Sequence, residues 1–263
     1  MIDPATIPWS DLIPFILIGF AAQTVDSALG MAFGVIGNSL LMLLGMPPAL
    51  ASSVTHTVEG FTSGASGVAH VLQRNVDWSL FARLVIPGIA GGLCGVWLLS
   101  VVSLTIVRPA VFVYLAAIGV YLIWRGARRP QAYRRMKLVG PLGLAGGFLD
   151  AVGGGGWGPV VTGNLLAQGM TPRMAIGTVN AAEFFVTVTV LSAFIGKLGL
   201  QSFTIAASGL LIGGIVAAPV GALVTRRLSS TSLLRGVGSV LIAISLVGLL
   251  SLMFGAIPVF ARF

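Results

Sequence analysis

Residues 150–159 read DAVGGGGWGP, and residues 26–35 read DSALGMAFGV. Each stretch places an aspartate a few residues before a glycine-containing turn, and apolar sequence flanks each stretch on both sides. Glycine weakens the interior of a helix and permits sharp turns of the backbone. The two stretches therefore predict helices that are broken inside apolar sequence, and these breaks decide the architecture of the chain.

The composition around the breaks is that of an integral membrane protein. Of the 263 residues, 56% are hydrophobic and 8% are charged, and the mean hydropathy is +1.02. A soluble domain has roughly a quarter of its residues charged, so a soluble enzyme, a secreted disulfide scaffold and a disordered regulator are excluded. The net charge is +8. A basic stripe with interleaved aromatic residues would indicate a nucleic-acid partner, and the sequence has no such stripe. The positive charge is therefore attributed to basic cytoplasmic loops.

Windows of about 20 residues divide the chain into ten apolar stretches. Two of them, 33–46 and 157–169, are too short to cross a bilayer of about 30 Å, and each follows one of the broken turns. We expect each to form a helical hairpin with the stretch before it. The prediction is an all-α polytopic membrane protein with a first repeat 1–124 (hairpin 12–46, helices 48–72, 79–102 and 105–124), a basic cytoplasmic linker 125–137, and a second repeat 138–263 (hairpin 138–169, helices 172–196, 203–225 and 232–254).

The two sets of five stretches are related by an internal repeat. When the chain is aligned with itself at a shift of 124 residues, 12 of the 43 positions from 19 to 61 are identical. The identities include the pairs Asp26/Asp150 and Glu59/Glu183, which account for four of only seven acidic residues. Because each repeat has an odd number of segments, we expect the two repeats to be inverted in the membrane, as in many secondary transporters.

The basic residues set the expected orientation. With the linker in the cytoplasm and each hairpin returning to the side from which it entered, Arg74, Arg173, Arg226 and Arg227 fall at the cytoplasmic boundary. A single crossing for each hairpin would place the last three of these outside. The positive-inside rule favours the first arrangement, which puts both termini on the extracytoplasmic side of a bacterial cytoplasmic membrane.

The four duplicated acids lie in apolar sequence. A carboxylate at the centre of a bilayer costs about 2.5–3.5 kcal/mol, so it needs a polar partner, a proton or a wet cavity. Asp26 and Asp150 precede glycine turns, where they either cap the following helix or take part in binding. Glu59 and Glu183 each lie eleven residues after a proline, in the middle of an expected helix where capping is impossible. For these two glutamates a functional role is favoured.

His56 lies three residues before Glu59, on the same face of the expected helix. The two side chains form either a simple ion pair or a proton relay, because histidine changes its charge near neutral pH. The second repeat has Asn180 at the position of His56, so only one repeat can move protons in this way. One histidine, one glutamate and the remote His70 do not form a recognisable metal site, and no metal ion or cofactor is expected.

Each glycine turn leads into the N-terminus of a short helix, where unpaired backbone N–H groups and the helix dipole favour an anion. Broken helices hold negatively charged substrates in this way in transporters. Nearby amide and hydroxyl side chains can add hydrogen-bond donors. The expected substrate contacts are Gln23, Asp26, Ser27, Gly30, Asn38, His56, Glu59, Asp150, Gly154, Gly155, Asn164, Asn180 and Glu183, and the candidates for proton exchange are Glu59, Glu183 and His56.

Two copies of an aspartate and a glycine turn, each followed by Gly-Met-x-Pro-x-x-Ala (45–51 and 169–175) and a polar helix, resemble the sulfite exporter TauE/SafE family of membrane permeases. The likeness extends over residues 12–254. It implies secondary transport, with or without protons, that exports a small sulfur-containing anion such as sulfite or a sulfonate. An anion channel is an alternative. An intramembrane enzyme, or a subunit of one, is disfavoured because the chain has no nucleophile elbow and no HExxH motif.

Overall fold

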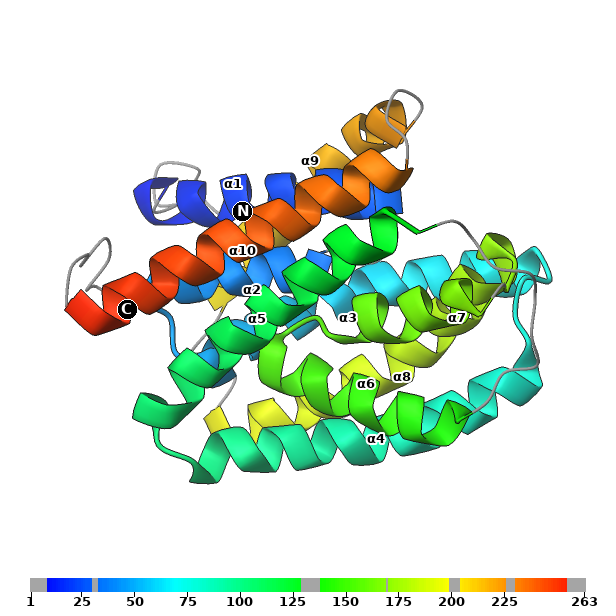
Figure 1. The fold of residues 1–263 in the computed structure, drawn as a ribbon, viewed down its shortest axis with the longest axis horizontal. Helices are drawn as coiled ribbons and strands as arrows, with labels where there is room; N and C mark the ends of the chain where they lie inside the picture. The colour runs from blue at the N-terminus through cyan, green and yellow to red at the C-terminus, as the bar shows by residue number, and fades with distance from the viewer. Residues whose placement is uncertain are drawn as a thin grey trace, which may run out of the picture.

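The computed structural model describes residues 9–29, 33–128, 138–168, 170–198, 204–225 and 230–254, and every regular element within them is a helix (Figure 1). The predicted all-α class is therefore confirmed. In chain order the helices are α1 (Trp9–Leu29), α2 (Phe33–Leu43), α3 (Pro48–Leu72), α4 (Trp78–Val101), α5 (Leu104–Gly126), α6 (Val139–Gly153), η2 (Gly158–Thr162), α7 (Gly163–Ala167), α8 (Pro172–Leu198), α9 (Thr204–Thr225) and α10 (Ser230–Phe254).

Local sequence explains where the central helices begin. Pro48 is the first residue of α3, a position where the missing N–H of proline costs no hydrogen bond. Asp77 precedes α4, and its Oδ1 accepts hydrogen bonds of 3.0 Å from the backbone N–H groups of Ser79 and Leu80. This is an N-cap, which satisfies donors that have no partner within their own helix. The connection between α3 and α4 is therefore a short and defined turn.

Helix breaks are present in both halves of the chain. The 11-residue helix α2 follows α1, and η2 and α7 follow the 15-residue helix α6. At about 16 Å, α2 is roughly half as long as the hydrocarbon core is thick. After α6 the backbone turns at Gly154, whose φ of +65° is a left-handed conformation that glycine adopts without strain. The turn between α1 and α2, which contains Gly30, lies outside the described residues.

The helices pack in four lengthwise pairs, which are α1 with α9, α4 with α6, α5 with α10, and α3 with α8. Figure 1 shows α10 alongside α5 and α6 alongside α4. Glycines permit the closest of these contacts, because a Cβ at Gly91 would overlap the backbone of Leu144, and a Cβ at Gly213 would overlap that of Ile16. Small residues at helix interfaces are the usual means of close packing inside a membrane.

Large apolar side chains face outward along the same helices. Leu17, Ile86 and Met253 have 63–75% of their surface exposed. Such exposure is unfavourable in water and costs nothing against lipid chains. The described helices that are long and apolar enough to cross a membrane, by length and composition, are Trp78–Val101, Thr105–Gly126 and Met174–Lys197.

Trp157 fixes the second break within the bundle. It is fully buried and lies just before η2. Its indole Nε1–H donates a hydrogen bond of 3.2 Å to the Val179 carbonyl of α8, and its ring lies against Gly88 of α4. The start of the second short helix is therefore held between two long helices.

Candidate functional site

Asp26 and Asp150 close the two helix breaks in the same way. Asp26 Oδ1 accepts a hydrogen bond of 3.1 Å from the backbone N–H of Phe33, the first residue of α2. Asp150 Oδ1 accepts one of 3.0 Å from the backbone N–H of Trp157. Each aspartate reaches seven residues ahead and binds a helix-start N–H group, which has no partner within its own helix. One oxygen of each aspartate carboxyl group therefore acts as the helix cap that the sequence offered as one interpretation.

The two breaks are in contact with each other. A Cβ at Gly155 would overlap the backbone of Gly34 and Val35, near the start of α2. Asn38, further along α2, donates a hydrogen bond of 2.5 Å from its Nδ2 to the carbonyl of Gly153. Segments that lie more than a hundred residues apart in the sequence thus meet at one point, and their backbones approach so closely that side chains are excluded there.

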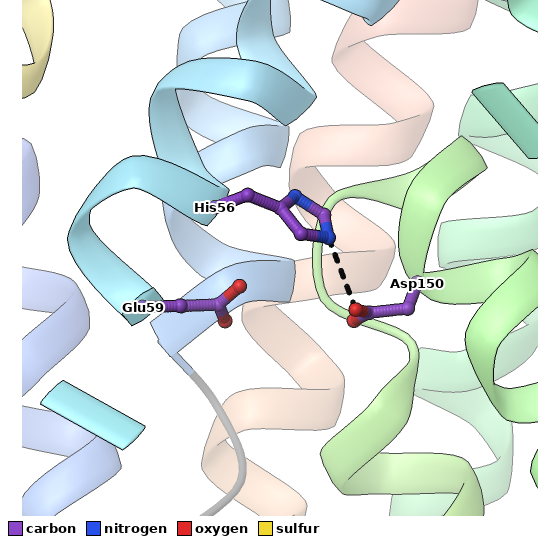
Figure 2. Close-up of side chains that lie close together, drawn as sticks. All are labelled: His56, Glu59 and Asp150. Carbon is purple, nitrogen blue, oxygen red and sulfur yellow. Dashed lines mark hydrogen bonds and ion pairs between the residues drawn. The ribbon is translucent and has the colours of Figure 1, made fainter. Parts of the chain in front are cut away.

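His56 of α3 links this crossing to the acids (Figure 2). Its Nδ1 lies 2.7 Å from the carbonyl oxygen of Ser52, and its Nε2 lies 3.0 Å from Asp150 Oδ2. Because a carbonyl oxygen only accepts hydrogen bonds, Nδ1 carries a hydrogen atom and donates it. The contact between Nε2 and Oδ2 then requires a second hydrogen atom between these two atoms. The His56–Asp150 pair therefore shares a proton, and neither side chain has any exposed surface.

Glu59 lies on α3 close to His56, and Figure 2 shows its carboxyl group directed toward the space beside the His56–Asp150 pair. The residue is 7% exposed, and its Oε2 has no hydrogen-bond partner among the described residues. The backbone of Gly34 lies near its Oε1. One polar atom each of His56, Glu59 and Asp150 lie within 4.8 Å of one another. A buried carboxyl oxygen with unused hydrogen-bonding capacity therefore lies beside the shared proton.

The four duplicated acids lie in one region of the bundle. Glu59 is close enough to interact electrostatically with Asp26, Asp150 and Glu183, and Glu183 interacts with both aspartates. Glu59 and Asp150 are buried, and a buried carboxylate either pairs with a positive group or takes up a proton. The arrangement can therefore bind protons, hold them and exchange them between neighbouring groups.

Comparison with known proteins places the chain in a family. The family model described as "Sulfite exporter TauE/SafE" matches residues 15–248. The chain belongs to the TauE/SafE family. It is also 38% identical over 225 residues to the "Probable membrane transporter protein YtnM" of Bacillus subtilis (strain 168), an alignment that covers 82% of this chain and 75% of that protein. No solved structure matches the chain.

The membership confirms the resemblance seen in the sequence. As a TauE/SafE protein, the chain is a multi-pass membrane transporter, and the family is one of transporters rather than of enzymes. The intramembrane enzyme is therefore removed from the candidate functions.

Other residues that the sequence analysis singled out have different surroundings in this TauE/SafE chain. Asn164 of α7 donates to the Val160 carbonyl at 2.6 Å, and Asn180 of α8 donates to Ser66 Oγ of α3 at 2.7 Å. Gln23 is buried in α1. These amides do not join the contact between His56, Glu59 and Asp150. Gly30 and the side chain of Ser27 lie outside the described residues.

One imidazole and two carboxyl groups are also donor types that divalent metals accept. In this site, however, Asp150 Oδ1 is bound by the backbone N–H of Trp157. The distance of 3.0 Å between His56 Nε2 and Asp150 Oδ2 is that of an ordinary hydrogen bond. A proton therefore accounts for the geometry of these groups without an ion.

Sequence reasoning found His56 and Asp150 separately and missed their contact. It grouped His56 with Glu59 by helical spacing, and Asp150 with Asp26 by the repeat. His56 and Asp150 are 94 residues apart, and no spacing rule connects such positions. The available signal was the difference between the repeats, since His56 is matched by Asn180 while the acids are matched by identical acids.

Proposed function

We propose that this TauE/SafE transporter exports a small sulfur-containing anion, such as sulfite or a sulfonate, across a bacterial cytoplasmic membrane, with both termini on the extracytoplasmic side. The family description, which names sulfite export, supports the class of substrate and the direction. The excess of 15 lysines and arginines over seven acids, with six of the basic residues between 125 and 137, supports the orientation.

The observation that carries the proposal is the crossing of two broken helices beside buried acids. Gly34 and Gly155 touch at the crossing, and His56, Glu59 and Asp150 lie next to it. Broken helices that meet inside a bundle are the usual setting of a substrate site in secondary transporters. The transport path is placed here, between the two repeats.

Matched packing supports the inverted relation of the two repeats. Helix α6 is the equivalent of α1 in the other repeat, and α9 is the equivalent of α4. The contact of α1 with α9 therefore corresponds to the contact of α6 with α4. In the same way the hydrogen bond from Phe33 to Asp26 corresponds to the one from Trp157 to Asp150. Equivalent contacts made from opposite halves are what a pseudo-twofold axis between inverted repeats generates.

The anion and the acids compete for the same helix-start donors. The N–H groups of Phe33 and Trp157 are bound to Asp26 and Asp150 in the arrangement described. An anion that uses these donors must replace a carboxylate. A protonated carboxyl group is a weaker acceptor than an ionised one, so proton uptake by the acids favours anion binding. Glu59, Glu183 and His56 exchange these protons, and Gln23, Ser27, Asn38, Asn164 and Asn180 supply further donors along the path.

The membrane potential alone favours export of an anion. An inside-negative potential contributes about 2.3 kcal/mol per charge for every 100 mV. Protons are therefore not required as an energy source. Their role is to neutralise the buried acids while the anion occupies the site.

The proposal is tested with the purified chain in proteoliposomes loaded with labelled sulfite, sulfate, thiosulfate or methanesulfonate. We expect saturable flux of at least one of these anions. Glu59→Gln and Glu183→Gln should each reduce net flux by tenfold or more without loss of folded protein, because a neutral amide cannot exchange protons. Cys94→Ser, at an exposed position of α4, is the control. Unchanged flux in both glutamate variants removes these carboxyl groups from the mechanism, and flux that does not saturate indicates a channel.

A further inference from the structure

The two hairpins share one hydrogen bond, and the second has a further contact with a histidine. In each, an aspartate Oδ1 accepts the backbone N–H of the residue seven positions ahead, at the start of the short helix. In the second hairpin, Asp150 Oδ2 also faces the His56 imidazole at 3.0 Å. The residue that corresponds to His56 in the other repeat is Asn180, which binds Ser66 and carries no exchangeable charge. A proton can therefore be held beside the second break by an imidazole, whereas the equivalent position of the other repeat carries an amide.

We propose that His56 and Asp150 together bind one exchangeable proton of the transport cycle, that Glu59 is the second acceptor for this proton, and that coupling to the anion therefore occurs at the second of the two helix breaks. The inference rests on the proposed function, because it assigns the residues that carry the proton within it. It adds Asp150, which the sequence analysis did not count among the proton-exchanging groups, and it gives the two helix breaks unequal roles.

The geometry determines how the proton moves. Transfer breaks the N–H bond at His56 Nε2 and forms an O–H bond on an ionised Glu59 carboxylate, one oxygen of which lies within 4.8 Å of a ring nitrogen of His56. His56 becomes neutral, and its Nε2 lone pair then faces the ionised Asp150. Because these two acceptors repel each other, the second break is held less firmly than before. The position of one proton thus controls the contact between Asp150 and α3.

The groups around the pair come from four helices. Glu59 lies on α3, and Asp26 and Glu183 approach from α1 and α8. Tyr114 of α5 lies against Gly153 and Gly156, close to Asp150, and its hydroxyl group has no partner among the described residues. The phenol is neutral, and the negative charge of the acids favours retention of a proton by the cluster. His56 is the basic group that receives and releases it.

The first test needs no substrate, because the chain contains two histidines, His56 and His70. In a His70→Gln background, 15N-histidine NMR of the protein in lipid reports His56 alone. We expect Nδ1 to carry a hydrogen atom and the Nε2 signal to show a hydrogen bond to a carboxyl group. Asp150→Asn should change the Nε2 signal, whereas Asp26→Asn, which alters the equivalent hydrogen bond of the first hairpin, should leave it unchanged. An Nε2 signal that is the same in both variants overturns the proton site.

The second test separates proton coupling from anion transport. With a pH-sensitive dye inside sulfite-loaded proteoliposomes, we expect the proton flux per sulfite exchanged to fall at least tenfold in His56→Asn and Asp150→Asn. Cys94→Ser, at an exposed position of α4, is the control and should keep both fluxes. His56→Asn reproduces the residue that the second repeat already contains, which provides a readout if Asp150→Asn does not fold.

The two tests distinguish failure of the inference from failure of the proposed function. If the unmodified chain exchanges sulfite but His56→Asn retains full proton flux, the inference is wrong and the transporter stands. If none of the tested anions moves while the Nε2 signal depends on Asp150, the substrate assignment is wrong and the proton site stands. A proton flux per sulfite exchanged that falls equally in Asp26→Asn and Asp150→Asn contradicts coupling at the second helix break.

Discussion

The two hairpins of this chain show how a duplicated element can keep one role and acquire a second. In the first, Asp26 binds the N–H of Phe33, and in the second, Asp150 binds the N–H of Trp157 at nearly the same distance. The second aspartate also binds His56, which belongs to the first repeat. The shared hydrogen bond secures a break in a helix, and the added one places a titratable pair at the crossing of the two breaks.

Asp26 and Asp150 close their helix breaks in the same way, and what distinguishes Asp150 is its contact with His56. Both aspartates are identical residues at equivalent positions, so an effect that depends only on closing the break should be similar for the two. An effect that depends on the proton should appear for Asp150 alone. Variants made in pairs, one in each hairpin, therefore separate the two roles.

The largest expected effect is that of Asp150→Ala compared with Asp26→Ala. Asp26→Ala removes a helix cap, which costs about 1 kcal/mol of stability. Asp150→Ala removes the equivalent cap and also leaves the buried imidazole of His56 without its partner, and breaking a buried charged pair costs about 3–5 kcal/mol. We expect thermal unfolding in detergent to show a clearly larger drop in midpoint for Asp150→Ala.

Asp150→Asn is the control for this pair, because its amide oxygen can still accept the N–H of Trp157. It should recover much of the stability lost in Asp150→Ala. Equal midpoints for Asp26→Ala and Asp150→Ala would mean that the contact with His56 contributes nothing to the fold.

A smaller but still large effect is expected at the crossing itself. In Gly155→Ala the new Cβ would overlap the backbone of Gly34 and Val35, and neither neighbour can move without shifting α2. Overpacking of this kind costs about 1–3 kcal/mol. We expect reduced transport and a lower unfolding midpoint. Gly37→Ala is the control, because a Cβ there meets only Leu210 and Thr55 side-chain atoms, at 3.8 and 3.9 Å. Normal behaviour of Gly155→Ala would show that the two backbones are not in close contact.

The sequence predicted the helical class and the breaks because both depend on local chemistry. Apolar stretches of membrane length and glycines after Asp26 and Asp150 are visible in the residues themselves. The short helix α2 and the turn at Gly154 follow from them. The π-helical turn of η2 was not predicted, since it depends on how Trp157 is held between α4 and α8 rather than on a sequence signal.

The site was less predictable because its contacts are made between repeats. Glu59 and His56 were grouped by helical spacing, which is a local property. The contacts of Asn38 with Gly153 and of His56 with Asp150 connect different halves of the chain, and they depend on how those halves pack. A repeat alignment states which positions are equivalent, but it does not state which of them touch.

The smallest expected effect concerns the residue after each break, Trp157 in one hairpin and Phe33 in the other. Trp157→Phe makes the two positions alike. It removes the hydrogen bond of 3.2 Å from the indole to the Val179 carbonyl and leaves the backbone bond to Asp150 in place. Loss of one hydrogen bond costs about 1 kcal/mol, and the smaller ring adds a modest packing loss beside Gly88. We expect a small drop in the unfolding midpoint with transport and proton flux unchanged. Transport that becomes faster would instead assign Trp157 to a gate, and a drop as large as that of Asp150→Ala would show that the indole, and not the carboxyl group, secures the second break.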